Sequence, residues 1–263
     1  MTQYVWNLTD DLNLLHSQVV ESLEEAAAFS TLSNQFSRLP EDSPLPEPEV
    51  VVRFGRVEEV ASRVRKGYSG LGAAFAVVSM ISAFEAYLTR LLLIRRSAEK
   101  AGQRGGLGGE EFNRLRTRVQ GESRTSPKRL VEKLVASPSE NLRVGAEWLD
   151  GIYRVRVCLT HRRGLVDTRD VNESGVLTAK WRKAEFHVGE KPLDHLPFRA
   201  EAGEQLSVRF VDENRTWRPG DRIEVGPEDC HHMAFSLAFL AGWLKEELHT
   251  EIQQLFGQRR NQS

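Results

Sequence analysis

Apolar side chains recur every three to four residues along most of the chain, which is the period of one helix face. This spacing predicts a long helix over residues 9–36. Prolines and acidic residues then indicate a surface loop over residues 38–49, and a second helical region begins near Val57. A strongly apolar helix follows over residues 73–101. The first part of the chain is therefore predicted to be helical with one long loop.

Glycines interrupt this pattern at two places. Gly67, Gly70 and Gly72 are expected to break or bend the chain before the apolar helix begins. The stretch 102–109 contains five glycines, but no Gly-Lys-Ser/Thr follows them, so it indicates a flexible connector rather than a phosphate-binding loop. The helical period then returns, and it predicts helices over residues 110–120, 126–136 and 139–161.

The pattern changes to short alternating segments between residues 165 and 226, which is typical of strands. The predicted strands cover residues 176–181, 206–211 and 222–225. Helical spacing resumes after Pro227 and predicts a closing helix over residues 228–256. We therefore predict a mainly α-helical protein, an antiparallel bundle with a small β-containing insertion before the last helix. Its parts would be a helical core over 1–164, the β-containing segment over 165–226, and a helix over 227–258 that packs back on the bundle.

Composition narrows the class of protein. The 263 residues carry a net charge of −1 and are 40% hydrophobic, which argues against a bulk polycation, a polyacidic tail protein and a largely disordered chain. Cys158 and Cys230 are too few for a disulfide framework, and the first nine residues lack a signal-peptide pattern, so we expect a cytoplasmic protein. Glu85 and Arg90 interrupt the apolar run 71–94, which favours a core helix and no membrane partner.

The stretch from Tyr153 to Asp167 is the best candidate for chemistry, because two arginines and His161 fall at the end of a helix. Histidine can take up and return a proton near neutral pH, and arginine matches phosphate oxygens. Together they suit attack by an RNA 2′-hydroxyl on the neighbouring phosphate, with no metal or cofactor. Such a reaction needs a base and an acid, so one histidine per chain suggests that two chains share a site. The alternative is a solvated helix end, with the histidine placed favourably at the helix dipole.

Helical geometry does not select one of the two arginines. Arg154 precedes His161 by seven residues and lies on the same face of an ideal helix, within about 20°. Arg156 lies about 140° from His161, although its long side chain could still reach it. Both arginines therefore remain candidates for the phosphate-binding cation.

This stretch resembles the HEPN superfamily of helical bundles, whose nuclease members carry Arg, four to six residues, and then His at a helix end. Gly164-Leu165-Val166-Asp167 continues the pattern as in several bacterial branches of that superfamily. Ser82 to Leu88 contains Phe-Glu-Ala-Tyr-Leu and is similar to an earlier helix of the family. Ser126-Pro127-Lys128, which opens a short helix between the two, is also similar. The resemblance covers about residues 71–167.

The resemblance implies a metal-independent endoribonuclease that acts as a homodimer with a shared cleft and leaves 2′,3′-cyclic phosphate ends. It also implies a toxin–antitoxin or phage-defence setting, in which an antitoxin or regulatory partner is possible. Carried over to this sequence, His161 is the general acid/base. Arg156 is the phosphate-binding cation at the four-residue spacing, and Arg154 is its equivalent at the six-residue spacing.

Two further positions bear on the activity. Val157 follows Arg156, where active members of the superfamily carry a polar residue, so one alternative is an inactive HEPN module that binds RNA, a nucleotide or a partner protein. The other alternative is a structural helical interaction protein. Glu85 is the only acid in the apolar run 71–88, and it either orients Arg154 or Arg156 or forms a structural pair with a buried cation.

The near-zero net charge conceals a segregated chain. Residues 1–50 hold one basic residue against nine acids, whereas residues 51–136 hold 17 against eight. The acidic part could simply neutralise the basic part in the fold, or the basic part could follow an RNA backbone. The residues expected to bind RNA in the second case are Arg114, Arg116, Arg118, Arg124, Lys128, Arg129, Arg162 and Arg163.

The remaining candidates are weaker. Cys230-His231-His232 has no second pair of metal ligands, and adjacent helical residues point about 100° apart, so no metal site is expected. His187 and His195 lie in polar sequence and are expected at the surface. Tryptophans are usually core residues, and Trp217, in a turn-rich segment, is the one that could stack on an RNA base.

Overall fold

The computed structural model describes residues 8–38, 57–104, 106–189, 191–192 and 206–260. Within these residues the chain forms six helices and one three-stranded antiparallel sheet, which confirms the prediction of a mainly helical fold with a small β segment. The helices are α1 (Leu8–Ser37), α2 (Val57–Arg104), α3 (Gly109–Glu122), α4 (Pro127–Leu134), α5 (Glu140–His161) and α6 (Pro227–Arg260). The strands are β1 (Leu177–Val188), β2 (Lys191–Pro192) and β3 (Leu206–Trp217). The proline-rich loop, apart from Arg38, lies outside these residues.

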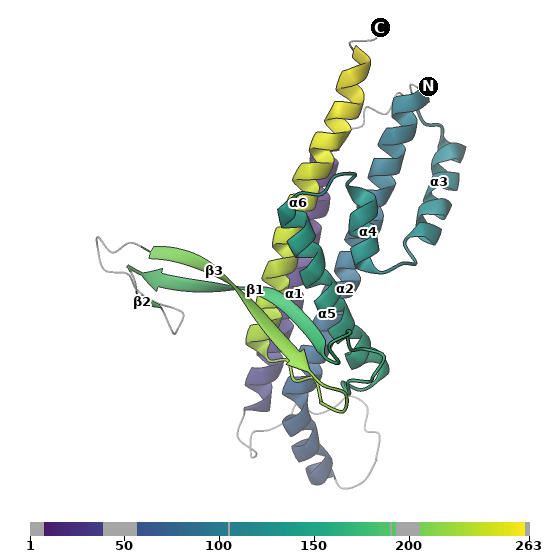
Figure 1. The fold of residues 1–263 in the computed structure, drawn as a ribbon. Coiled ribbons are helices and arrows are strands. Elements are labelled where there is room, and N and C mark those ends of the chain that lie inside the picture. Colours follow the sequence, from purple (N-terminus) through teal and green to yellow (C-terminus); the bar gives the residue numbers. More distant parts are fainter. Residues whose placement is uncertain (1–7, 39–56, 105, 190, 193–205, 261–263) are drawn as a thin grey trace.

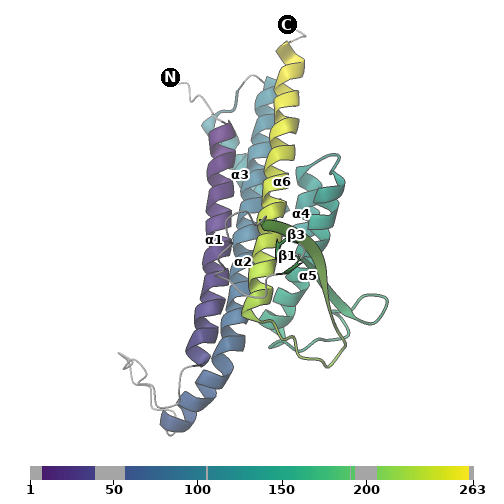
Figure 2. The same ribbon diagram turned by 90° about the vertical axis from the view of Figure 1, so that its left-hand side faces the viewer.

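Three long helices form the body of the molecule. Figure 1 and Figure 2 show α1, α2 and α6 running side by side, with α4 and α5 packed along the pair formed by α2 and α6. Their shared core is apolar, and Phe84, Leu149 and Leu240 are fully buried in it. Burial of such side chains contributes about 1.5 to 3 kcal/mol each. The regular spacing places them on one face of each helix, and their burial holds the helices together.

The predicted break at Gly67, Gly70 and Gly72 is wrong, because α2 continues without interruption from Val57 to Arg104. Gly72 faces α1 instead. A Cβ atom at this position would lie 2.2 Å from Cβ of Ser33, so only glycine permits this approach of the two helices. Since α2 extends to Arg104, Gly102 is also helical and the connector to α3 is shorter than expected.

The apolar part of α2 has a membrane-like composition. Among the described residues, Gly70–Gln103 is long and apolar enough to cross a bilayer, and half of its most apolar window is buried inside the protein. Helix α2 contacts α1, α4, α5 and α6. Packing against these helices accounts for the buried half of that window.

Two glycines let other elements approach α5 closely. A Cβ at Gly151 would lie 2.8 Å from the Cα of Ala179 in β1, and a Cβ at Gly145 would lie 2.8 Å from a methyl group of Leu240 in α6. Both glycines are buried. Gly145 therefore permits the close packing of α6 on α5, and Gly151 permits that of β1.

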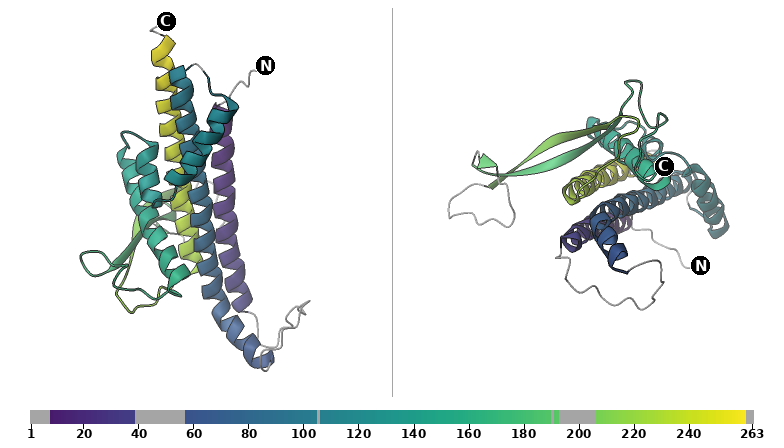
Figure 3. Two further views of the ribbon diagram at one scale, coloured as in Figure 1. Left: turned by 90° about the vertical axis from the view of Figure 1, so that its right-hand side faces the viewer. Right: turned by 90° about the horizontal axis from the view of Figure 1, so that it is seen from below.

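The sheet has the order β2-β1-β3, and β1 pairs with β3 in register from Leu177 opposite Trp217 to Val188 opposite Leu206. Alternate residues of β1 near the bundle, Leu177, Ala179 and Trp181, are buried. Figure 3 shows that the far end of this hairpin projects away from the helices. The third predicted strand, 222–225, is wrong, since only an isolated bridge between Leu165 and Arg222 forms there.

Candidate functional site at the end of α5

Backbone hydrogen bonds fix the point at which α5 ends. The N–H groups of Arg162 and Gly164 both donate to the carbonyl of Cys158 at 3.0 Å. Arg163 and Gly164 have φ angles of 53° and 80°, which is the left-handed conformation that commonly ends helices. The Gly164 carbonyl also accepts the N–H of Ile223 at 2.8 Å. His161 is therefore the last helical residue at a well-defined corner of the fold.

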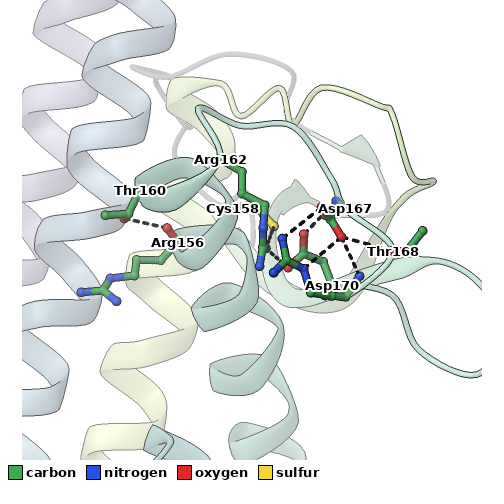
Figure 4. Close-up of polar contacts among 8 residues, drawn as sticks. Arg156, Cys158, Thr160, Arg162, Asp167, Thr168 and Asp170 are labelled. Atoms are coloured by element: carbon green, nitrogen blue, oxygen red, sulfur yellow. Dashed lines mark hydrogen bonds and ion pairs between the residues drawn. The ribbon is translucent and has the colours of Figure 1, made fainter.

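One side of this corner is a buried polar cluster. The guanidinium of Arg162 forms an ion pair with Asp170, which is 8% exposed, and lies 3.9 Å from the Cys158 sulfur (Figure 4). Asp170 also accepts the backbone N–H of Asp167 at 2.8 Å. These contacts tie the chain after α5 back to the helix. Arg162, expected from the sequence to bind RNA, is thus placed in a structural ion pair.

The pKa values in this cluster fit a structural role. Burial raises the pKa of the Cys158 thiol to about 11, so the thiol remains protonated at neutral pH and is a poor nucleophile. Asp167 accepts hydrogen bonds from the side chain and backbone of Arg169, at 3.2 and 3.1 Å, and these hold its pKa well below the usual range. Asp167 is therefore ionised and closes the turn.

The other side of the corner is open. His161 is exposed, and its side chain makes no hydrogen bond or ion pair with any residue that the structure describes. Arg163, two residues further on, is also exposed and has no ion-pair partner within the same part of the chain. An imidazole and a guanidinium at this corner are therefore both accessible to a ligand.

The two arginines within α5 differ in their surroundings. Arg154 is exposed and donates to the Asp150 carboxylate, one turn earlier, at 3.0 Å. Arg156 is partly buried, and its Nε is shielded from solvent without a hydrogen-bond partner among the described residues. Its guanidinium carbon lies 6.0 Å from the centre of the Tyr153 ring. Figure 4 shows Arg156 and Thr160 on the side of α5 opposite Arg162 and Asp170.

Glu85 of α2 lies close enough to Arg156 for their charges to interact. Desolvation raises the pKa of the half-buried Glu85 carboxyl, and the positive charge of Arg156 partly opposes that shift. Within the described chain, the two side chains form no direct hydrogen bond or ion pair with each other. The fold therefore brings Glu85 near Arg156 rather than near Arg154. The sequence alone does not predict which of the two arginines lies near Glu85.

The residues around Glu85 explain why it occupies this position. Phe84 and Leu88 are fully buried on the core side of α2, and the Tyr87 hydroxyl donates to the Ala241 carbonyl of α6 at 2.9 Å. Burial raises the pKa of Tyr87, so the hydroxyl remains a donor. These three anchors fix the rotation of α2 about its axis, and Glu85 is left on the side that contacts α5.

The structure does not gather all the predicted RNA-binding residues at this corner. Arg114 and Arg118 pair with Glu110 and Glu122 on their own helix, α3, which packs on α2. In Figure 1, α3 lies beside the opposite end of α2 from the corner. Two more of the predicted RNA-binding residues are exposed, Arg116 on α3 and Arg124 in the turn after it. Lys128 and Arg129 lie on α4, which contacts α5.

The structure decides two of the weaker candidates. Trp217 is 9% exposed and packs in the core beside β1, as expected for most tryptophans, so its ring is not a surface for base stacking. The prediction that His187 lies at the surface is wrong, because the residue is 6% exposed. His195 lies outside the described residues. No group of three His, Cys, Asp or Glu side chains that could hold a metal ion occurs among the residues with a described placement.

Sequence reasoning missed Asp170, the partner of Arg162. Its signal in the sequence is weak, since Asp167 and Asp170 are simply two acids three residues apart in a turn. Comparison of the chain with models of known protein families, with curated proteins and with solved structures found no match. A function for this chain is therefore inferred from the geometry of the site and from the sequence motif that it contains.

Proposed function

We propose that the chain is a HEPN-type, metal-independent endoribonuclease, and that the open side of the α5 corner is its reactive surface. The observation that supports this most is the environment of His161, which is exposed at a rigid helix end with no partner for its imidazole among the described residues. Because this imidazole is exposed and makes no contact within the described chain that binding would break, it is free to exchange a proton with a bound RNA. The setting implied for such an enzyme is toxin–antitoxin or phage defence in the cytoplasm.

In the proposed reaction, His161 removes the proton from an RNA 2′-hydroxyl. The 2′-oxygen then attacks the adjacent phosphorus, a bond from that oxygen to phosphorus forms, and the bond to the 5′-oxygen breaks. His161 of the partner subunit gives a proton to the leaving 5′-oxygen, so the products are a 2′,3′-cyclic phosphate and a 5′-hydroxyl. Arg156 stabilises the negative charge that develops on the phosphate, and Glu85 orients Arg156.

A second candidate is an inactive HEPN module that binds RNA or a nucleotide. Val157, which is partly buried, supplies no polar group beside Arg156. Arg154 and Arg162 are already engaged with Asp150 and Asp170. Fewer free cations at the corner would favour binding without efficient stabilisation of the transition state.

The test is cleavage of a single-stranded RNA oligonucleotide by the purified protein in the presence of EDTA. We expect products that end in 2′,3′-cyclic phosphate, and no cleavage of the same sequence with 2′-O-methyl groups, because the methyl group removes the nucleophile. The His161→Ala variant should cleave at least about 100-fold more slowly, since general acid–base catalysis contributes about 10² to 10⁴. Its unfolding free energy should change by less than about 0.5 kcal/mol, because the side chain is exposed.

The control is His249→Ala, which removes a histidine on α6 that contacts Thr9 and should leave cleavage unchanged. Wild-type cleavage that survives in His161→Ala would refute the assignment. Saturable RNA binding with no cleavage between about pH 5 and pH 9 would favour the second candidate, because that range covers both protonation states of histidine.

A further inference from the structure

A cavity separates part of α3 from α2, away from the α5 corner. Its volume is about 740 Å³, and its walls come from one face of α2, the connector and the start of α3. The residues that line it include Leu93, Ile94, Ser97, Ala101, Leu107 and Phe112. A cavity of this size lies within the range of about 300 to 1,000 Å³ that is typical of sites for small molecules.

Apolar side chains dominate this cavity. Leu93, Ile94 and Leu107 are only partly buried, and Phe112 is 39% exposed. These groups pack on the protein from one side and face the cavity on the other. Covering them with an apolar molecule would remove their surface from water, which is favourable.

Ser97 is the one lining residue of the described chain that carries a hydroxyl. The residue is 9% exposed, and its hydroxyl has no hydrogen-bond partner among the residues that the structure places. A serine in a helix commonly donates to the carbonyl four residues earlier, as Ser236 does to His232 at 2.8 Å, but Ser97 does not. An unpaired buried hydroxyl is costly, and rotating it toward a ligand in the cavity would sacrifice no existing bond.

Charged side chains around the cavity are paired with one another rather than directed into it. Lys100 of α2 lies 3.4 Å from Glu111 of α3, and Arg96 lies 3.5 Å from Glu122. These pairs, together with the buried Leu115, hold α3 on α2. Within the described chain no charged residue lines the cavity, so a charged ligand would lose its hydration without compensation.

We propose that this cavity is a binding site for an uncharged, largely apolar small molecule with one hydrogen-bonding group, which Ser97 engages. The apolar walls select the body of the ligand, and the single unpaired hydroxyl selects its one polar group. The site is separate from the proposed RNA chemistry, since α3 packs on α2 and, in the part of the chain that is described, makes no contact with α5.

The proposal is tested with Nile red, an uncharged apolar dye with a carbonyl oxygen whose fluorescence rises in apolar surroundings. We expect saturable binding to the wild-type chain at one dye per chain, and competition by 1-decanol but not by decanoate. Absence of saturable binding would overturn the proposal, as would equal competition by decanoate.

Two variants locate the dye. Ala101→Phe fills the cavity and should weaken binding at least about tenfold, whereas Ala136→Phe adds the same ring at an exposed position after α4 and should leave binding unchanged. Ser97→Ala should weaken binding by about three- to tenfold, the loss expected for one hydrogen bond. Circular dichroism confirms that each variant is folded. Unchanged affinity in Ala101→Phe would place the dye elsewhere and refute the site, and unchanged affinity in Ser97→Ala would refute the hydrogen bond.

Discussion

The two sides of the α5 corner carry similar residue types in opposite environments. On one side, Arg162 pairs with the buried Asp170. On the other, His161 and Arg163 are exposed, with no ion-pair partner in the described chain. Residues 161–163 are consecutive in the sequence, yet only His161 and Arg163 are accessible to a ligand.

The difference shows how one short motif can serve two purposes. The inner side, which contains Arg162 and Asp170, fixes the chain reversal through this ion pair and the hydrogen bonds to the Cys158 carbonyl. The outer side, which contains His161 and Arg163, exposes His161 without using it for stability. We infer that substitutions on the inner side change folding, whereas substitutions on the outer side change activity.

The largest effect on stability is expected from Asp170→Ala. This change leaves Arg162 without its partner and the Asp167 N–H without its acceptor. Removing one member of a buried pair costs about 3 to 5 kcal/mol, and because Arg162 is partly exposed we expect about 2 to 3 kcal/mol in a urea unfolding curve. Asp150→Ala is the matched control, because its partner Arg154 is exposed and the loss should stay below about 1 kcal/mol. Equal losses in the two variants would show that the Arg162–Asp170 pair contributes no more to stability than an exposed pair.

A smaller effect is expected from Gly151→Ala, on the face of α5 that supports the sheet. The new methyl group would lie 2.8 Å from the Ala179 backbone, so β1 must shift, at a cost of about 1 to 3 kcal/mol that the better helix propensity of alanine partly offsets. Gly121→Ala on α3 meets no neighbouring atom within 4 Å and should stabilise the protein by up to about 1 kcal/mol. Thermal unfolding measures both. A stabilised Gly151→Ala would show that the sheet does not rest on α5 as described.

The smallest effect concerns Glu85, whose pKa is raised by burial. The folded state then binds the proton more tightly than the unfolded state, so stability falls as pH rises from the unfolded pKa through the higher folded pKa. Glu85→Gln removes this dependence. At neutral pH the variant should be more stable than wild type by less than about 1 kcal/mol, because water screens a half-buried group. Denaturation midpoints across the acidic and neutral range measure the effect, and identical pH profiles would contradict it.

The helices could be predicted because their apolar spacing is regular. The predicted helix over residues 139–161 differs from Glu140–His161 by one residue, and Gly164 lies just beyond its end in the left-handed conformation that stops a helix. The predicted break before residue 73 fails for a physical reason. A glycine can mark a close helix contact as well as a break, and only the position of Ser33 reveals which applies.

The site could be predicted only in part. The sequence marks His161, Arg156 and Glu85 as candidates, but the proximity of Glu85 to Arg156 depends on the rotation of α2, which Tyr87 fixes through the Ala241 carbonyl, 154 residues away in α6. The ion pair between Arg162 and Asp170 likewise depends on a turn whose path local sequence does not determine. Long-range contacts of this kind leave no periodic signal.

The central claim is that two copies of His161 act in one cleft, and subunit mixing tests it most directly. Wild-type protein is mixed with about a ninefold excess of His161→Ala protein, and RNA cleavage per wild-type chain is measured after subunit exchange. If both histidines are required, about nine in ten wild-type chains have an inactive partner, and the rate per wild-type chain should fall to about a tenth. An unchanged rate per wild-type chain, with exchange verified, would contradict the shared site.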